Sequence, residues 1–232
     1  DGGILSFGAN CFNIAFILPF TGFFIYKILN KIHLSPFYHK CTIFLSAYIS
    51  INLAAFFTAL ELGIQPLLFV DNLGQPLYCP YPLWISIPAM ALSHLTIAGI
   101  AEGLFTLSLY LFILKTSPNI IYDSQQIKLN SIFSLLAFLI IISPLGLIAE
   151  GTAWGEWDPE EILNDTSSGV PLGFIPEKLL NGFNYEAFFP DYTMSGTTDI
   201  LAYIASAIIG VALLIIIFKI LGSIIYAKKQ SL

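Results

Sequence analysis

The sequence predicts an all-α membrane protein with about five transmembrane helices and one loop-rich segment outside the membrane. Of its 232 residues, 56% are hydrophobic and only 10% are charged, and the mean hydropathy is +0.81. Soluble domains usually carry about 25% charged residues, so most of this chain is expected to face lipid or other apolar helices. Lipid offers the backbone no hydrogen-bond partners, and every segment that crosses it must therefore be helical.

Apolar stretches of about 20 residues are needed to cross the hydrocarbon layer. The sequence contains five such stretches, which we predict as the membrane spans: Gly8–Leu29, Thr42–Leu62, Ile85–Leu114, Leu129–Ala149 and Ile200–Tyr226. The third is long and has Pro88 near its start, so it is expected to tilt or to begin in the headgroup layer.

The nine basic residues are all lysines, and they lie at alternate connections between the spans. The fourth connection contains only Lys178, and the second contains none. The first and third connections and the C-terminal end carry the others, which are Lys27, Lys31, Lys40, Lys115, Lys128, Lys219, Lys228 and Lys229. Positive charge favours the cytoplasmic side, so the N-terminus of this multi-pass chain is predicted outside the plasma membrane and its C-terminus in the cytoplasm.

The predicted fourth connection, residues 150–199, is an external segment that holds most of the 15 acidic residues. Within it, Asp158 precedes Pro159 as a candidate N-cap, and "GFIPEKLL" is typical of a turn followed by a short helix. The segment is too short and loop-rich for a large core of its own. Aromatic residues on both sides of the spans, such as Tyr81, Trp84 and Trp154, are expected in the headgroup layer.

Two ionisable residues inside the third span, His94 and Glu102, are candidates for a function because burying them costs free energy. On a regular α-helix they lie about 12 Å apart and share a broad face, too far apart to chelate one ion. His94 could line a cation path while Glu102 relays charge. Alternatively, each bonds to a neighbouring helix and holds the bundle together, which is the commoner situation.

Further polar and small residues inside the spans are candidates for a cavity wall or for helix packing. Gly99 and Gly103 form a GxxxG pair that allows another helix backbone to approach closely. The amides of Asn10, Asn13 and Asn52 could ligate a hard cation, but bridging between helices is the favoured interpretation. Glu61 is predicted at the outer end of its span, where water would solvate it.

The sequence carries no phosphate-binding loop of the GxxxxGK[ST] type, no HExxH and no GxSxG. Basic patches for nucleic acid are absent as well. We therefore predict no enzymatic activity, no tightly bound cofactor and no nucleic-acid partner, and no catalytic residue is assigned. An intramembrane enzyme that uses His94 and Glu102 is disfavoured, because no nucleophile or metal-ligand set accompanies them.

The segments "DGGILSFGANCFNIAFILPFTGFFIYKIL", "INLAAFFTALELGIQPLLF" and "GQPLYCPYPLWISIPAMALSHLTIAGIAEGLFT" closely resemble the later transmembrane part of the CbiM/NikM family. The resemblance covers about residues 1–115 and keeps the spacing across three spans. From about residue 143, "SPLGLIAEGTAWGEWDPEE" and "GFIPEKL" resemble the C-terminal extension of longer members. We accordingly expect a transmembrane core at 1–119, an extension with two spans at 120–232, and a C-terminal fragment of a longer protein.

The resemblance implies a substrate-capturing membrane component of an energy-coupling factor importer for Co²⁺ or Ni²⁺ in a bacterium or archaeon. It also implies a coupling transmembrane protein and cytoplasmic ATPases as partners, with a small accessory membrane subunit as an open alternative. The family's N-terminal chelating residues have no counterpart in these residues, so no metal ligand is carried over. A second hypothesis is a membrane assembly subunit that docks a partner through residues 150–199.

Overall fold

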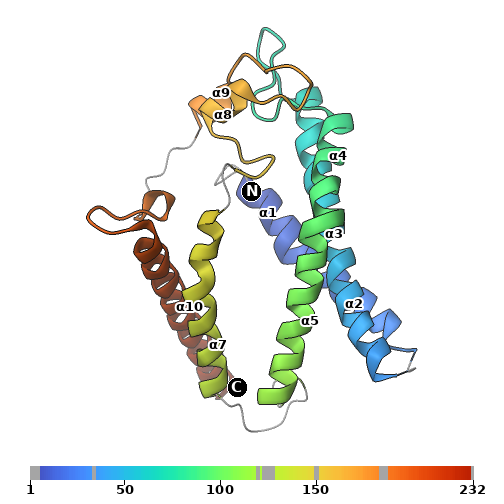
Figure 1. Ribbon diagram of the computed structural model, residues 1–232, viewed down its shortest axis with the longest axis vertical. Coiled ribbons are helices and arrows are strands. Elements are labelled where there is room, and N and C mark those ends of the chain that lie inside the picture. The colour runs from blue at the N-terminus through green and yellow to red at the C-terminus, as the bar shows by residue number, and fades with distance from the viewer. Residues whose placement is uncertain are drawn as a thin grey trace. The chain divides into compact units, whose positions relative to one another are not determined.

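The computed structural model describes residues 6–32, 35–118, 121, 129–148, 152–182 and 188–230, with only the backbone described for 191 and 225–230. It confirms the predicted fold class. Five helices are long and apolar enough to cross a membrane, and the described residues contain no β-strand, only an isolated bridge between Val70 and Pro76 (Figure 1). The five spans are Phe7–Leu29, Pro36–Leu68, Leu83–Thr116, Leu129–Ile148 and Asp199–Ile224.

Two of these spans are interrupted by wider π-helical turns. The first runs through α1 (Phe7–Asn10), a π segment (Cys11–Ile17) and α2 (Leu18–Leu29). The third runs through α4 (Leu83–Ser93), a π segment (His94–Ala98) and α5 (Gly99–Thr116). Such turns are rare and are enriched at functional sites. They contain two of the polar candidates, Asn13 and His94.

The second span, α3, occupies Pro36–Leu68 and is longer at both ends than the predicted Thr42–Leu62. Its N-cap is Ser35, whose side chain accepts a hydrogen bond from the Tyr38 backbone N–H at 3.2 Å, and Pro36 fits the first turn. At its other end the helix continues through Pro66. Hydropathy locates the apolar part of a helix but not its polar, capped ends, and the predicted span was therefore too short.

The described residues divide into two compact units, each taken by itself here. Unit 1 comprises those within 1–121 and 152–184, and unit 2 those within 122–151 and 185–232. In unit 2, α7 (Leu129–Ile142) and the 3₁₀ turn Ser143–Ile148 pack on α10 (Asp199–Gln230), which follows another 3₁₀ turn at Pro190–Tyr192. The predicted boundary at residue 119 stays a prediction.

In unit 1, α3 packs against α2, α4 and α5 through close approaches. A Cβ atom added to Gly63 would overlap the Oγ of Ser86, which donates a hydrogen bond to the Ala59 carbonyl oxygen at 2.9 Å. A Cβ on Gly103 would lie 2.6 Å from the Phe44 ring. Glycine at these positions therefore lets the three helices approach closely.

His39, which the sequence analysis did not single out, joins three helix ends in unit 1. Its ring nitrogens lie 2.9 Å from the Asn30 Oδ1 and 3.2 Å from the Tyr110 hydroxyl. The end of α2, the start of α3 and the final turns of α5 therefore meet at one end of the unit. The lysines at this end are Lys27, Lys31, Lys40 and Lys115.

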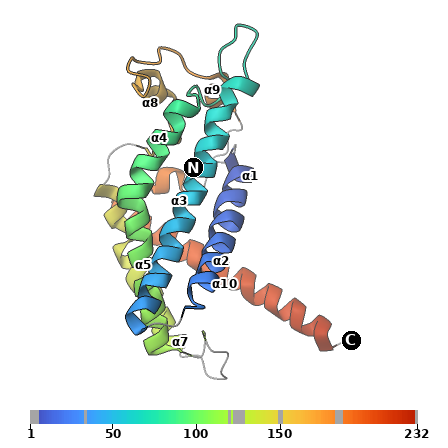
Figure 2. The same cartoon turned by 90° about the vertical axis from the view of Figure 1, so that its right-hand side faces the viewer.

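The opposite end of unit 1 is covered by residues 152–182, which we call the capping segment (Figure 2). It contains two short helices, α8 (Pro159–Asn164) and α9 (Glu177–Leu180). Asp158 is the N-cap of α8, as predicted, and its backbone N–H donates to the Glu161 carboxylate at 3.3 Å. The turn and helix predicted from "GFIPEKLL" are likewise confirmed by α9.

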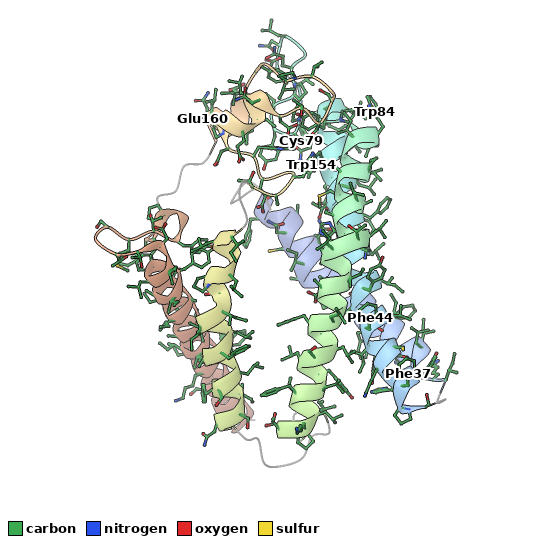
Figure 3. The ribbon with its side chains drawn as sticks, in the orientation of Figure 1. Phe37, Phe44, Cys79, Trp84, Trp154 and Glu160 are labelled. Carbon is green, nitrogen blue, oxygen red and sulfur yellow. The ribbon has the colours of Figure 1, made fainter. Side chains whose placement is uncertain are left out.

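The capping segment shares a hydrophobic core with the loop before α4 and the end of α3. Leu62, Cys79, Tyr81, Trp157 and Ile162 are all buried in it. The labelled Cys79 and Trp154 lie together in this region (Figure 3). Tyr81, Trp154 and Trp157 thus pack within the protein, although aromatic residues here were expected to face lipid headgroups. Trp84, in contrast, is 77% exposed.

Candidate functional site

The candidate site is a polar cluster between the first span and α3, near the capped end of unit 1. Asn13, only 1% exposed, donates from Nδ2 to the Thr58 Oγ1 at 3.1 Å and to the Glu61 Oε2 at 2.7 Å. The Thr58 hydroxyl in turn donates a hydrogen bond to the Ala54 carbonyl oxygen at 3.1 Å. Asn13 therefore bridges two helices, which is the interpretation the sequence favoured for it.

The other amide atom of Asn13 distinguishes this cluster from ordinary helix packing. Its Oδ1 is buried and has no hydrogen-bond partner among the described residues. A buried acceptor without a partner costs about 1–3 kcal/mol. The π segment that carries Asn13 widens the helix at this point, and an unpaired buried acceptor requires an explanation such as a bound water or ion.

A cavity of about 240 Å³ adjoins the cluster. Its polar wall includes Asn10, Thr58, Glu61 and Gln65 from the spans, and the capping segment contributes Gly155 and Lys178. Asn10, one of the sequence candidates, donates from Nδ2 to the Ser6 Oγ at 3.2 Å. The capping segment is thus part of the cavity and not only a neighbour of it.

A second cavity of about 360 Å³ lies next to the first, because the two share four bordering side chains: Glu61, Gln65, Tyr78 and Lys178. We call these four residues the throat. The second cavity is otherwise bordered by Ile64, Phe69 and Leu77. Glu61 is the only acidic side chain among the described residues that border either cavity.

Tyr78 contributes a neutral phenol to the throat. Partial burial raises its pKa above the ordinary value, and the neighbouring Cys79 and Glu156 raise it further. Gln65 is held by the loop before α4, since the Cys79 backbone N–H donates to its Oε1 at 3.4 Å. Burial also raises the pKa of Cys79 to about 12, so this thiol is protonated and unreactive at neutral pH.

The donor set of the cluster is chemically suited to a cation. Carboxylate, amide and hydroxyl oxygens are hard ligands that bind metal ions directly or through their water shell. Within the described residues, no three His, Cys, Asp or Glu side chains come together as a metal centre. The cluster can therefore receive and orient a hydrated cation, but it does not form a set of nitrogen or thiolate ligands.

The described hydrogen bonds of His94 lie within its own helix. Its Nδ1 lies 2.9 Å from the Met90 carbonyl oxygen and 3.0 Å from the Ser93 Oγ. Among the described residues, the His94 ring makes no contact with the Asn13–Glu61 cluster. The geometry expected for His94 and Glu102 assumed a regular α-helix, and the π segment that begins at His94 changes the rotation between them.

Glu102 borders a different cavity, of about 400 Å³, between α2, α3 and α5. It accepts a hydrogen bond from the Thr106 hydroxyl at 3.1 Å, again within its own helix. Ser46, Ser50 and Tyr110 add hydroxyl groups to a wall that is otherwise mostly apolar. The structure therefore separates Glu102 from the Asn13–Glu61 cluster, and a role of His94 or Glu102 in transport stays a prediction.

The remaining candidates lie where α3 meets the third span. A Cβ on Gly99 would approach the Asn52 Nδ2 to 2.6 Å and the Tyr48 ring to 2.9 Å. Asn52 donates to the Tyr48 carbonyl oxygen at 2.7 Å, within α3. Gly99 and Gly103 are both buried against α3, which is the close contact expected of a GxxxG pair.

Sequence reasoning undervalued Glu61 and missed Lys178. Glu61 was expected at a solvated helix end, but α3 continues about two turns beyond it, so its carboxylate is half-buried and bonded to Asn13. A signal was present, because the spacing of Thr58 and Glu61 places both on one face of a helix. No local sequence pattern could predict that Lys178 belongs to this site, because it is far from Glu61 along the chain.

The capping segment is held over the site by a charged contact. Tyr81 donates its hydroxyl proton to the Asp165 carboxylate, which also accepts the Ser167 backbone N–H at 2.9 Å. Burial alone would raise the pKa of Asp165, but the hydrogen bonds from Tyr81 and Ser167 outweigh it and hold the pKa below its ordinary value. Burial and Asp165 raise the pKa of Tyr81, so the phenol stays a donor.

Acid is expected to loosen the capping segment. A carboxylate with a lowered pKa stabilises the fold above its unfolded pKa and loses that contribution as pH falls through the folded pKa, here below about 4. We expect a loss of about 1 kcal/mol, discounted for partial exposure. Tryptophan emission followed from pH 6 to pH 3 should shift to the red in wild type. Asp165→Asn should flatten this change, and an unaltered titration would contradict the assignment.

Comparison with known proteins identifies the family. Residues 1–120 match CbiM, described as the cobalt uptake substrate-specific transmembrane region, and residues 129–227 match the PDGLE domain. The chain is 39% identical over 220 residues to the probable fused nickel transport protein LarMN of Lactiplantibacillus plantarum, which covers 94% of this chain and 66% of that protein.

One further curated relative and one solved structure are similar to this chain. The fused nickel transport protein NikMN of Rhodobacter capsulatus is 36% identical over 231 residues, covering 93% of this chain and 67% of that protein. A crystal structure of a truncated transition metal transporter is 47% identical over 50% of this chain and 52% of that chain, with a TM-score of 0.46. The chain spans about two thirds of the length of the two fused relatives. It belongs to the CbiM family of cobalt uptake transmembrane proteins and carries a PDGLE domain after the CbiM region.

Proposed function

We propose that this protein is the membrane component that captures Co²⁺ or Ni²⁺ for an ATP-driven importer of the energy-coupling factor type. The family supports the class of cargo, since two relatives are named nickel transport proteins and the matching region is described by cobalt uptake. The protein itself is non-catalytic in this proposal. A coupling membrane protein and cytoplasmic ATPases supply the energy.

The observation that carries the proposal is the Asn13–Glu61 pair. The Glu61 carboxylate borders a cavity at one end of the membrane helices, and it accepts a hydrogen bond from a buried amide whose oxygen has no partner among the described residues. Such a pair of oxygen ligands suits the transient binding of a cation before it passes to ligands of higher affinity. Amide and carboxylate oxygens do not distinguish cobalt from nickel, and the choice between the two ions falls to ligands of another kind.

We propose further that the capped end of unit 1 faces the exterior. Four lysines lie at the opposite end, where His39 joins the helix ends, and the capped end has Lys178 with many carboxylates. This distribution is the one that the positive-inside tendency favours. A cation would then meet the capping segment before it meets Glu61.

The second hypothesis, an assembly subunit that docks a partner through residues 150–199, is less well supported. The apolar side of the capping segment is already covered, because Trp157 and Ile162 are buried in the core shared with Tyr81 and Leu62. Its exposed acidic groups, such as Glu160, remain open to a partner. An importer with an accessory subunit would accommodate both roles.

Expression of the full natural reading frame together with its coupling protein and ATPases is expected to raise cellular uptake of Co²⁺ or Ni²⁺ well above that of an empty vector. Accumulated metal can be measured by mass spectrometry with both ions offered separately. A matched strain with an inactive ATPase controls for passive leakage. Uptake equal to that of the vector for both ions would reject the importer assignment.

A further inference from the structure

We propose that Lys178 is a tethered competitor for the transported cation: its ammonium group competes with the arriving ion for the carboxylate of Glu61. The capping segment would then select divalent over monovalent cations at the throat, before any ion reaches Asn13. The proposal rests on the proposed function for the nature of the cargo, and it adds a selectivity element that comes from outside the residues 1–120 that match CbiM.

The first support is the position of Lys178. The four throat residues border both cavities, so the Lys178 and Glu61 side chains lie on the boundary between them. The backbone of Lys178 is anchored there, because its N–H donates to the Leu77 carbonyl oxygen at 2.9 Å and Pro176, two residues earlier, is fully buried.

The second support is the freedom of the Lys178 side chain. It is exposed, whereas Glu61 is half-buried and fixed by the 2.7 Å hydrogen bond from Asn13. A lysine ammonium on a four-carbon stem can approach a fixed carboxylate and leave it again without moving the backbone. An anchored backbone with a mobile charged tip is what a displaceable competitor requires.

The third support is the charge balance of the throat. Its other members, Gln65 and Tyr78, are neutral, and Tyr78 stays protonated because its pKa is raised. Within the throat, Lys178 carries the positive charge and Glu61 the negative charge, and Glu156 places a further carboxylate near Tyr78. A monovalent ion that replaces the ammonium gains little, whereas a divalent ion brings twice the charge to the same carboxylate. Competition of this kind favours divalent ions.

A purely structural role for Lys178 makes different predictions. If the Lys178 side chain only helped α9 to dock, its removal would loosen the capping segment. Any resulting change in ion affinity would then be the same with or without the Glu61 charge. The competitor role predicts the reverse, namely an intact capping segment and an affinity change that requires the Glu61 charge. Lys178→Met keeps most of the aliphatic stem and removes the charge, so it separates the two roles.

The test is titration of the full natural protein in detergent with Co²⁺ and Ni²⁺ by calorimetry at low ionic strength. Lys178→Met is expected to raise affinity for both ions about three- to tenfold and to increase inhibition of binding by Na⁺ or K⁺. Glu61→Gln keeps an acceptor for Asn13 but removes the charge. In the double variant Lys178→Met with Glu61→Gln, the increase in metal affinity should therefore be absent. Lys115→Met, at the opposite end of unit 1, is the matched control and should change nothing.

Elution volume and tryptophan emission establish that each variant keeps its capping segment. An unchanged affinity in Lys178→Met, a gain that survives Glu61→Gln, or no binding in any variant overturns the competitor role. Normal cellular uptake together with an unchanged Lys178→Met affinity overturns this inference alone. A Glu61-dependent gain in a protein that gives no uptake supports the inference and counts against the importer function.

Discussion

Replacing Glu61 by alanine is expected to lower uptake of Co²⁺ or Ni²⁺ at least tenfold. Glu61 is the only acidic residue among the described ones that border the two cavities, and it accepts the hydrogen bond of the buried Asn13 amide. Its loss removes the attraction for a cation and leaves an amide donor short of a partner. A hydrogen bond to a charged group contributes about 1.5–3 kcal/mol, and 1.4 kcal/mol already corresponds to a factor of ten.

The measurement is metal accumulation in cells that also contain the coupling protein and the ATPases, normalised to the amount of protein in the membrane. Glu160→Ala is a suitable control, because it removes an exposed carboxylate from α8 on the capping segment. Glu61→Gln should fall between wild type and Glu61→Ala, since it keeps an acceptor but not the charge. Wild-type uptake by Glu61→Ala would show that the cluster only packs the helices.

The membrane helices could be predicted from the sequence because composition alone requires them. Long apolar stretches with few charges cannot fold in water, and in lipid they can only be helical. Their ends and internal geometry were harder to predict. The polar turn that begins at Ser35 and the passage through Pro66 have no hydropathy signal. The π turns at Cys11–Ile17 and His94–Ala98 break the 3.6-residue period on which the expected positions of His94 and Glu102 depended.

The candidate site was predictable only in part. Asn13 could be identified as a bridging amide because a polar side chain inside a span needs a partner. Its partner Glu61 was placed too close to the helix end, an error that followed from the short predicted span. The contribution of the capping segment could not be read locally, since Lys178 meets Leu77 across about 100 residues of chain. Tertiary packing decides contacts of this kind.

Gly103→Leu is expected to have the largest effect on stability. A Cβ at this position would lie 2.6 Å from the Phe44 Cε2, closer than carbon atoms can approach, and a leucine would force α5 away from α3. Overpacking a close contact costs about 1–3 kcal/mol and occasionally more, and helix association in lipid depends on such close contacts. The variant should lose several degrees of thermal stability and aggregate in detergent.

Phe44→Ala provides the decisive comparison, because it empties the space that the new side chain would need. The double variant Gly103→Leu with Phe44→Ala should recover most of the lost stability, whereas Gly210→Leu on α10, where an added Cβ meets nothing within 4 Å, should cost little. Thermal unfolding in detergent, followed by size-exclusion chromatography, measures all three. If Gly103→Leu were as stable as wild type, α3 and α5 would not be in the close contact described, and the walls of the cavity at Glu102 would have to be assigned again.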